Sequence, residues 1–321
     1  MADITRRDFL GRSASCGAHL AIMAAAMPRA RRDWWAHTPR GQVVAQEPFG
    51  NLERVAENIW ALISTPLNGD NTTLSNGGII AGRTGVLAIE GFYRPRGAEW
   101  LAGKARELTG RWPTHVALTH YHADHANGTA GYLAGTDRPA IRATEVTRDQ
   151  VFERNRPPDD ARSAALREVE FLSPTEPTTL DLGGRTVRIV PRSGHTDSDI
   201  SLEIDDPSVV FCGDLYWNAM FPNYVDAIPT QLSASVRALR RDRATVYVPG
   251  HGALGAGVDL DRYLAVLDLV EQGARRAHES GASAEDGGTA FTLPESLGEW
   301  MLFNPAYFAR AFGAWYRELG W

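Results

Sequence analysis

The chain has 321 residues, of which 43% are hydrophobic, and its formal net charge is −6 at pH 7. This length and hydrophobic content allow a large core in one or two domains. The acidic balance, with no basic stripe in the sequence, argues against nucleic acid as a partner.

The first 30 residues predict a twin-arginine signal peptide. Arg6 and Arg7 form the arginine pair, Phe9 and Leu10 follow, and residues 17–27 are weakly apolar and rich in alanine. That stretch is too short to span a bilayer as a stable helix. The combination is typical of an export signal that is later removed. We therefore expect a periplasmic or otherwise exported protein without a stable membrane span; the alternative is a disordered basic tail.

Of the two cysteines, Cys16 lies in the predicted signal, and Cys212 would be the only cysteine of the mature chain. No internal disulfide could then form, even in an oxidising compartment. Cys212 ends the apolar run 209–212, which predicts a buried strand. We expect a core thiol there rather than a metal ligand.

Residues 31–50 contain Pro39, Gly41 and Pro48 and show little periodicity, so they predict a loose leader before a domain at 51–321. Short apolar runs bounded by glycine or asparagine then predict three strands. A helix and a further short buried strand follow. These elements are expected at residues 59–64, 78–81 and 86–90 (strands), 95–108 (helix) and 115–119 (strand).

The second half also mixes strands and helices, and it contains no tandem repeat. We expect one domain in which a central pair of sheets is flanked by helices. The glycine pair in residues 182–185 predicts a hairpin turn. The other expected elements are a mostly helical segment at 141–171, strands at 186–190, 200–204, 209–211 and 245–248, helices at 232–240 and 260–278, a linker at 282–288 and a C-terminal helical segment at 291–321.

The C-terminal helical segment is rich in aromatic residues, which could pack in the core or form a dimer face. An oligomer through this segment is therefore one of two expectations. The residues concerned are Trp300, Phe303, Tyr307, Phe308, Phe312 and Trp315.

Seven histidines and aspartates form the strongest pattern in the chain. Four of them lie within the run from Thr119 to His125, and the other three each follow a glycine near the end of an apolar run. The seven are His120, His122, Asp124, His125, His195, Asp214 and His251. Imidazole and carboxylate are the ligands that zinc takes where no thiolate is offered. Because the groups are split by short and long intervals, they predict a site for two metal ions.

Residues i and i+2 of an extended segment point the same way, so His120 and His122 can bind one ion, with His195 as a third imidazole. Asp124 and His125 can face a second ion, completed by His251. The two oxygens of Asp214 could bridge both ions. We expect two Zn²⁺ per chain, although iron or manganese would suit the same ligands.

Such a site has a defined chemistry. A three-histidine site keeps an open position for water, and a water between two zinc ions loses a proton near neutral pH to give a hydroxide nucleophile. Asp124 is the candidate catalytic residue, because its carboxylate can orient the hydroxide and pass its proton to the leaving group.

The order H-x-H-x-D-H, then His, Asp and His, resembles that of the metallo-β-lactamase superfamily over roughly residues 52–275. The segments 194–196, 213–215 and 250–252 match its later motifs. The resemblance implies a four-layer αβ/βα sandwich, with the site at one edge between two sheets. It also implies a hydrolase of small esters, thioesters, lactones, amides or phosphate esters.

Two positions separate this chain from the cysteine-ligand β-lactamases of the family. Asp214 stands where they have a cysteine, and Trp217 stands where they have a substrate-binding lysine; Lys104 is the only lysine here. The chain looks closer to the bridging-aspartate hydrolases, which attack an acyl carbon. The alternatives are a true β-lactamase that uses an arginine for the substrate carboxylate, a non-catalytic periplasmic metal-binding accessory protein, and a flavodiiron-like reductase, which would need further carboxylates and a flavin domain.

Five more residues are candidates for contacts around the metals. Asp199 could accept a hydrogen bond from a metal-bound imidazole, or it could cap a turn before a strand. Tyr216, Trp217, Asn223 and Tyr224 follow the bridging aspartate and could form a substrate wall, or they could pack in the core.

Overall fold

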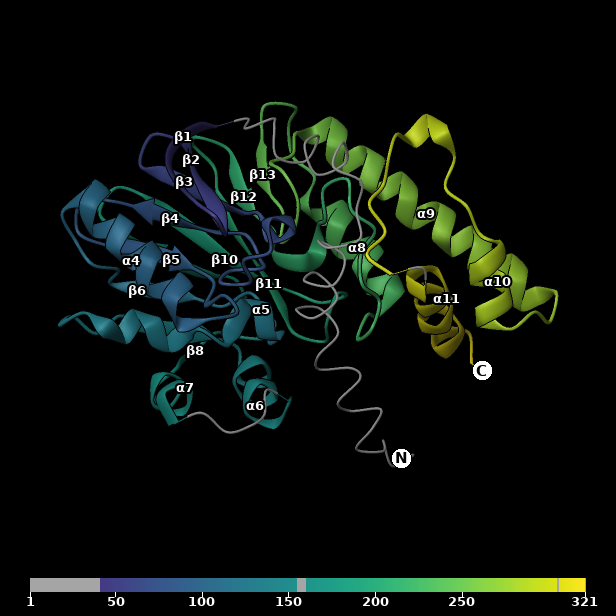
Figure 1. The fold of residues 1–321 in the computed structure, drawn as a ribbon, viewed down its shortest axis with the longest axis horizontal. Helices are drawn as coiled ribbons and strands as arrows, with labels where there is room; N and C mark the ends of the chain where they lie inside the picture. Colours follow the sequence, from purple (N-terminus) through teal and green to yellow (C-terminus); the bar gives the residue numbers. More distant parts are fainter. Residues whose placement is uncertain (1–40, 155–159, 305, 321) are drawn as a thin grey trace.

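The computed structural model describes residues 41–154, 160–304 and 306–320. The predicted signal peptide and residues 31–40 lie outside this part. Within it, two β-sheets pack face to face, and helices cover the outer face of each sheet (Figure 1).

The first sheet has eight strands in sequence order. Neighbouring strands are antiparallel from β1 to β5 and parallel from β5 to β8. In β3, alternate residues face opposite ways: Ile59, Ala61 and Ile63 contact the second sheet, while Trp60 and Leu62 contact helix α4. The strands are β1 (Gln42–Glu47), β2 (Gly50–Ala56), β3 (Ile59–Ser64), β4 (Gly77–Ala81), β5 (Val86–Ile89), β6 (His115–Ala117), β7 (Ala140–Ala143) and β8 (Glu170–Phe171).

The second sheet has five strands in the order β13-β12-β11-β10-β9. Its strands are antiparallel except for β12 and β13, which are parallel. Gly183 and Gly184 both have positive φ in the predicted hairpin turn between β9 and β10, which confirms that turn. The strands are β9 (Thr178–Asp181), β10 (Thr186–Arg192), β11 (Asp199–Ile204), β12 (Val209–Phe211) and β13 (Val246–Val248).

The residues at the two ends of helix α4 (Pro95–Thr109) explain where this helix begins and ends. Proline occupies its first turn, and Gly110 ends it in the left-handed conformation, where its N–H bonds the carbonyl of Arg106. No helix among the described residues is long and apolar enough to cross a membrane. The other helices are α5 (Ala123–Ala126), α6 (Glu145–Arg154), α7 (Asp160–Ala165), α8 (Pro229–Leu239), α9 (Gly257–Glu279), α10 (Ala284–Ala290), α11 (Ala306–Leu319) and the 3₁₀ turns η1 (Pro66–Asn68), η2 (Thr129–Ala134), η3 (Gly213–Leu215) and η4 (Glu295–Leu297).

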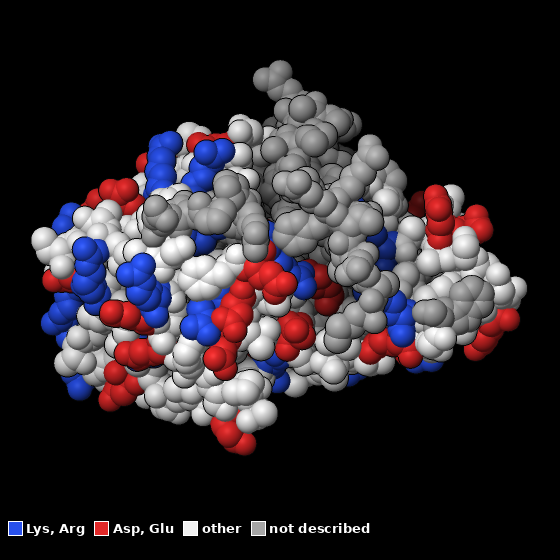
Figure 2. All heavy atoms as spheres, turned by 90° about the horizontal axis from the view of Figure 1, so that it is seen from below, with Lys and Arg blue, Asp and Glu red and all other residues white. Residues whose placement is uncertain are grey.

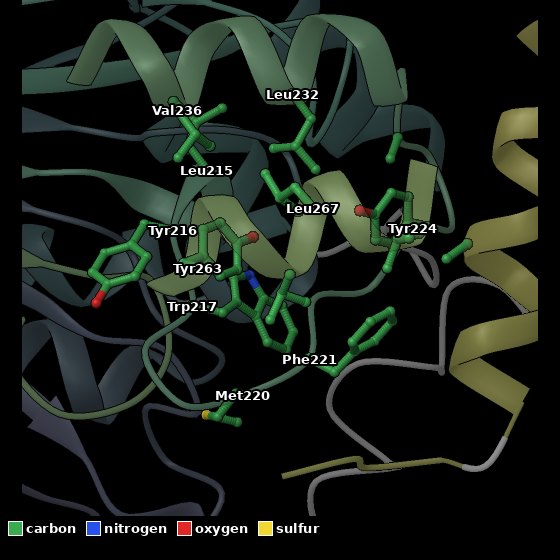
Figure 3. Close-up of a cluster of buried hydrophobic side chains, with 14 of the residues drawn as sticks. Leu215, Tyr216, Trp217, Met220, Phe221, Tyr224, Leu232, Val236, Tyr263 and Leu267 are labelled. Carbon is green, nitrogen blue, oxygen red and sulfur yellow. The ribbon is translucent and has the colours of Figure 1, made fainter. Parts of the chain in front are cut away.

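Three buried clusters hold the layers together and confirm the predicted four-layer sandwich. The first lies between the sheets, the second between the first sheet and α4, and the third between the second sheet and helices α8, α9 and α11. Figure 3 shows the third cluster, in which Leu232 and Val236 of α8 face Leu267 of α9.

Two sequence-based expectations for secondary structure are wrong, and the expectation for residues 141–171 is incomplete. The described end of the expected leader forms β1 and the start of β2; β1 is an edge strand with mostly exposed side chains, so no hydrophobic alternation marks it. The segment 141–171 contains strands β7 and β8 besides its helices. The expected linker at 282–288 is largely helix α10, whose N-cap Ser283 accepts a bond from the amide of Asp286.

The C-terminal aromatic residues belong to the core rather than to an exposed dimer face. Phe303, Tyr307, Phe312 and Trp315 are each at most 2% exposed and pack in the third cluster. Their segment also pairs with the loop after η3, because Met220 and Met301 form a parallel β-bridge. These four residues are therefore unavailable for an interface, and only Trp300 and Phe308 remain partly exposed.

A buried ion-pair network stabilises the outer face of the second sheet. Glu203 on β11 is 5% exposed, and its carboxylate accepts hydrogen bonds of 2.8 Å each from Arg192, Arg241 and Ser201. Burial by itself would raise the pKa of Glu203, but these hydrogen bonds and the arginine charges outweigh it and lower the pKa.

Replacing Glu203 by glutamine should therefore destabilise the protein in a pH-dependent way. Because folding lowers the pKa of Glu203, its ionised form stabilises the fold above the ordinary glutamate pKa, and that stabilisation is lost as the pH falls through the lowered value. Glu203→Gln should reduce the free energy of unfolding by about 2 kcal/mol near pH 7. Urea unfolding at several pH values should show this difference shrinking in acid; a constant difference would contradict it.

Candidate metal centre

Four of the seven predicted ligands occupy equivalent places in the fold. His120, His195, Asp214 and His251 each lie three residues beyond the end of a strand, β6, β10, β12 and β13 respectively. Since β11 is antiparallel to both of its neighbours, β10, β12 and β13 run the same way, and their carboxyl ends meet at one edge of the second sheet. The short helix α5 adds Asp124 and His125.

One group of candidate ligands consists of His120, His122, His195 and Asp214, whose ligand atoms all lie within 4.8 Å of one another. His195 Nε2 is 3.0 Å from His122 Nδ1 and 3.2 Å from Asp214 Oδ2. His120 Nε2 is 3.8 Å from the same carboxylate oxygen. We call these residues the first group.

The second group consists of Asp124, His125 and His251, whose ligand atoms also lie within 4.8 Å of one another. His251 Nε2 is 3.3 Å from Asp124 Oδ2 and 3.3 Å from Asp214 Oδ1. His125 Nε2 is 3.0 Å from Asp214 Oδ1. The structure thus brings all seven predicted residues together.

Asp214 lies between the two groups and turns one oxygen toward each. Its Oδ2 faces the histidines of the first group, and its Oδ1 faces those of the second. Gly250 makes this approach sterically possible, because a Cβ built at that position would lie 1.9 Å from Asp214 Oδ1.

The chemistry of these donors fits divalent cations. Six of the seven side chains are at most 3% exposed, and His122 is partly exposed. Among the described residues, no hydrogen-bond partner is found for either carboxylate oxygen of Asp124 and of Asp214, or for the Nε2 atoms of His120, His125 and His251. Buried carboxylates without donors are costly unless a cation compensates them. The same charges act on His251: burial opposes its protonation, but Asp214 and Asp124 raise its pKa to about 9.

Glu90 supports both groups, and the sequence analysis did not identify it. It follows β5, is 1% exposed, and has a strained positive φ of 77°. Its Oε1 lies 3.0 Å from His125 Nδ1 and accepts a 2.5 Å hydrogen bond from Thr119 Oγ1, which is in turn 3.0 Å from His120 Nδ1. A carboxylate on the far nitrogen fixes the tautomer of a ligand histidine.

Asp226 lies beside the ring of His122 as Glu90 lies beside that of His125. No motif in the sequence identified Asp226 either. Its Oδ2 lies 3.1 Å from His122 Nε2 and accepts a 2.7 Å bond from Arg154 at the end of α6. Burial opposes ionisation of Asp226, but the hydrogen bond from His122 and the charges of His122 and Arg154 outweigh it and lower its pKa. Because Asp226 contacts Nε2 of His122, the other ring nitrogen, Nδ1, faces His195 in the first group.

Asp199 caps a turn and does not touch an imidazole ring. Its carboxylate accepts hydrogen bonds from the backbone amides of His195 and Thr196 and from the Thr196 hydroxyl. Burial raises its pKa to about 7, although these hydrogen bonds oppose the shift. Of the two expectations for Asp199, the structure supports the turn cap, which positions His195 through its backbone.

The expected substrate wall after Asp214 is largely core. Tyr216 and Tyr224 are 0% and 2% exposed and lie in the cluster beneath α8 and α9 (Figure 3). Asn223 is buried, and its side chain accepts a bond from the amide of Val225. Trp217 alone contacts the centre: its ring centroid is 4.2 Å from that of His251. At 1% exposed, it shields the second group rather than lining an open pocket.

The two-sheet fold and the buried donor groups are those of a metal-dependent hydrolase. A family model described as "Metallo-beta-lactamase superfamily" matches residues 77–251, more than half of the chain. The chain therefore belongs to the metallo-β-lactamase superfamily.

Curated relatives are distant. The hydroxyacylglutathione hydrolase of Acidiphilium cryptum is 28% identical over 216 residues, 66% of this chain and 77% of the relative. Matches to two further hydroxyacylglutathione hydrolases span 50% and 40% of those proteins. Thioesterase pkgB of Emericella nidulans is 25% identical over 238 residues, 72% of this chain and 61% of the relative. The 2,4-dinitroanisole O-demethylase subunit alpha of a Nocardioides species is 25% identical over 246 residues, 68% of this chain and 70% of the relative.

Solved structures share the fold. The metallo-beta-lactamase from Pontibacter korlensis has a TM-score of 0.55 at 20% identity, covering 68% of this chain and 98% of that one. The metallo-beta-lactamase from Erythrobacter litoralis has a TM-score of 0.54 at 16% identity, covering 70% and 98%. At these identities the likeness supports the architecture alone.

Adding a single methyl group at Gly250 should disrupt the centre. The new Cβ would overlap Asp214 Oδ1, so the carboxylate or the loop must move away from the second group. After loading with zinc and dialysis, Gly250→Ala should retain less of the metal than the wild type, as measured by metal analysis. Gly103→Ala in α4 is the control, because its Cβ meets no atom within 4 Å. The control should keep its zinc and gain up to about 1 kcal/mol of stability; equal zinc content in both variants would contradict this account.

Proposed function

We propose that this protein is a dinuclear zinc hydrolase that attacks an acyl carbon. The observation that carries the proposal is the shared carboxylate: the two oxygens of Asp214 face two separate groups of buried donors. His120, His122 and His195 would hold one ion, Asp124, His125 and His251 the other, and Asp214 would bridge them. Iron or manganese is the alternative content for the same donors.

When bound, two divalent ions would supply an activated water and would stabilise negative charge on the substrate. The chain's own residues supply the rest. No donor among the residues that the structure describes bonds either oxygen of Asp124, so its carboxylate can orient the water and pass a proton to the leaving group. Trp217 covers His251 and excludes bulk water from that side.

Esters and thioesters are the substrates that we favour, with lactones and amides as close alternatives. Relatives named hydroxyacylglutathione hydrolase and thioesterase support this class. Trp217 is buried, and it stands at the position where the resemblance to the cysteine-ligand β-lactamases implies a substrate-binding lysine. Figure 2 shows one face of the molecule, on which acidic and basic side chains are interspersed, with no continuous basic stripe over the described residues of that face. Such a surface favours a small substrate over a phosphate backbone.

A substrate panel separates this proposal from its two rivals. The zinc-loaded protein should hydrolyse acyl thioesters and esters faster than nitrocefin, because the buried Trp217 offers no cation for a lactam carboxylate. Faster turnover of nitrocefin would identify a true β-lactamase instead. If no ester, thioester, lactone or lactam is hydrolysed despite full zinc occupancy, the site belongs to a non-catalytic metal-binding accessory protein.

Removing the shared carboxylate should affect both zinc content and turnover. We expect close to two zinc ions per chain, and Asp214→Ala should lose most of the second ion. Its turnover should fall by more than the roughly 10–100-fold that loss of an outer-shell partner typically costs. Asp268→Ala, an exposed aspartate on α9, is the control. Full turnover in Asp214→Ala would show that this residue does not bridge.

We also propose that residues 1–30 direct export by the twin-arginine pathway, which carries folded proteins. Arg6 and Arg7 with the apolar stretch at 17–27 support this. Changing both Arg6→Lys and Arg7→Lys should leave the uncleaved protein in the cytoplasm, whereas Arg12→Lys should be exported normally. Cell fractionation with N-terminal sequencing measures both; export of the double variant would refute the pathway.

A further inference from the structure

Two adjacent residues, Ser75 and Asn76, lie just before β4 and beside the second group. Both are buried, at 0% and 2% exposed. Neither is a candidate ligand, yet each donates hydrogen bonds to segments that carry ligands.

Asn76 holds the loop that presents His251. Its Nδ2 donates to the carbonyl oxygens of Pro249 at 2.9 Å and Gly252 at 2.8 Å, and its backbone N–H donates to that of Gly250 at 2.8 Å. Three of the carbonyls that flank His251 thus bond to one residue. The amide of Ser64 on β3 donates to Asn76 Oδ1 at 2.8 Å, which fixes the orientation of the side-chain amide.

Ser75 holds the segment that presents Asp124. Its Oγ donates to the Asp124 carbonyl at 2.6 Å. The third ligand of the second group, His125, is held from the neighbouring strand end, where Gly91 N–H donates to its carbonyl at 2.6 Å. The backbones of all three ligands are therefore tied to the ends of β4 and β5 in the first sheet.

The first group depends on different contacts. Thr119 bonds the ring of His120, Asp226 bonds that of His122, and Asp199 accepts from the backbone of His195. Among the hydrogen bonds of the described residues, those of the Ser75 and Asn76 side chains reach none of these histidines. The two groups share Asp214 and the carboxylate of Glu90, whereas the side-chain bonds of Ser75 and Asn76 go to segments of the second group.

We propose that Ser75 and Asn76 are positioning residues that set the affinity of the second group for its cation and leave the first group almost unchanged. This inference rests on the proposed two-metal function. Removing the Asn76 amide leaves two buried carbonyls without donors, and they can regain partners only if the loop carrying His251 moves. Metal ligands tolerate displacements of only about 0.5 Å before affinity falls.

Zinc titration of four variants tests the proposal. Asn76→Ala and Ser75→Ala are the test variants. Asn218→Ala is the control for Asn76, because its Nδ2 also donates to two carbonyls of the same loop, but to those of Ala253 and Leu254 beyond His251. Ser64→Ala is the control for Ser75, because it is also buried, and its hydroxyl contacts Phe49 and Thr73 rather than a ligand segment.

Affinities for Zn²⁺ alone are measured by competition with a chromophoric chelator, with metal analysis for stoichiometry and cobalt substitution to report on each site. In both test variants one of the two zinc sites should lose about 10–100-fold in affinity while the other stays unchanged, and the cobalt spectra should assign the loss to the second group. Both controls should match the wild type.

Equal weakening of both sites, unchanged affinity in the test variants, or equal losses in the controls would overturn the inference. If Asn76→Ala does not fold, Ser75→Ala with its Ser64→Ala control decides by the same criteria. A wild-type protein that binds only one zinc ion would instead overturn the proposed function, so the two failures are distinguishable.

Discussion

The structure depends on how it accommodates two buried carboxylates, Asp124 and Asp214. Neither receives a hydrogen bond from the part of the chain that the structure describes, and imidazole nitrogens lie 3.0 Å from Asp214 and 3.3 Å from Asp124. In a water-excluded setting these negative charges need positive charge close by. Protons on His251 can provide it, as the raised pKa of that residue indicates, and so can divalent cations. The centre is therefore a place where cations and protons compete for the same atoms, and cation binding releases protons.

The fold brings these charges together through the directions of its strands. Because β10, β12 and β13 run the same way, three loops emerge at one edge of the second sheet, and each places a ligand three residues after its strand. The first sheet supplies the other four candidate ligands, which lie in the loop after β6 and in helix α5. The carboxylate of Glu90, at the end of β5, then links the ring of His125 to Thr119 and the backbone that precedes His120. The loops that carry the candidate ligands are short and bonded to strand ends, so the positions of the sheets determine those of the side chains.

The sequence alone predicted which seven side chains come together, because their pattern is local. His120, His122, Asp124 and His125 lie within six residues, and the later ligands each follow a glycine at the end of an apolar run. The supporting residues could not be found in this way. Asp226 is 104 residues from His122, and Asn76 is 173 residues from Pro249. No spacing rule connects residues so far apart, although an isolated acidic residue at the end of a buried strand, such as Glu90, was a usable signal.

The difference between local sequence patterns and long-range packing also explains which secondary-structure expectations were wrong. Strand β1 was missed because an edge strand with exposed side chains has no hydrophobic alternation. Helix α10 was missed because Gly287 and Gly288 suggested a flexible segment, although Ser283 and Asp286 carried a capping signal. For Tyr216 and Tyr224, aromatic side chains next to a predicted site were compatible with either a pocket wall or a core. Only the positions of α8, α9 and α11 decide between these, and those positions result from the whole chain.

The β-bridge between Met220 and Met301 has a consequence for how the centre is completed. The loop after Asp214 is paired with a segment near the end of the chain, and Phe303 packs against Trp217, which packs against His251. A ribosome-bound chain that has reached only His251 already contains every ligand, but it lacks the strand partner and the aromatic support of the loop beside them. Synthesis must therefore proceed through Phe303, about 50 residues beyond His251, before a finished centre can assemble.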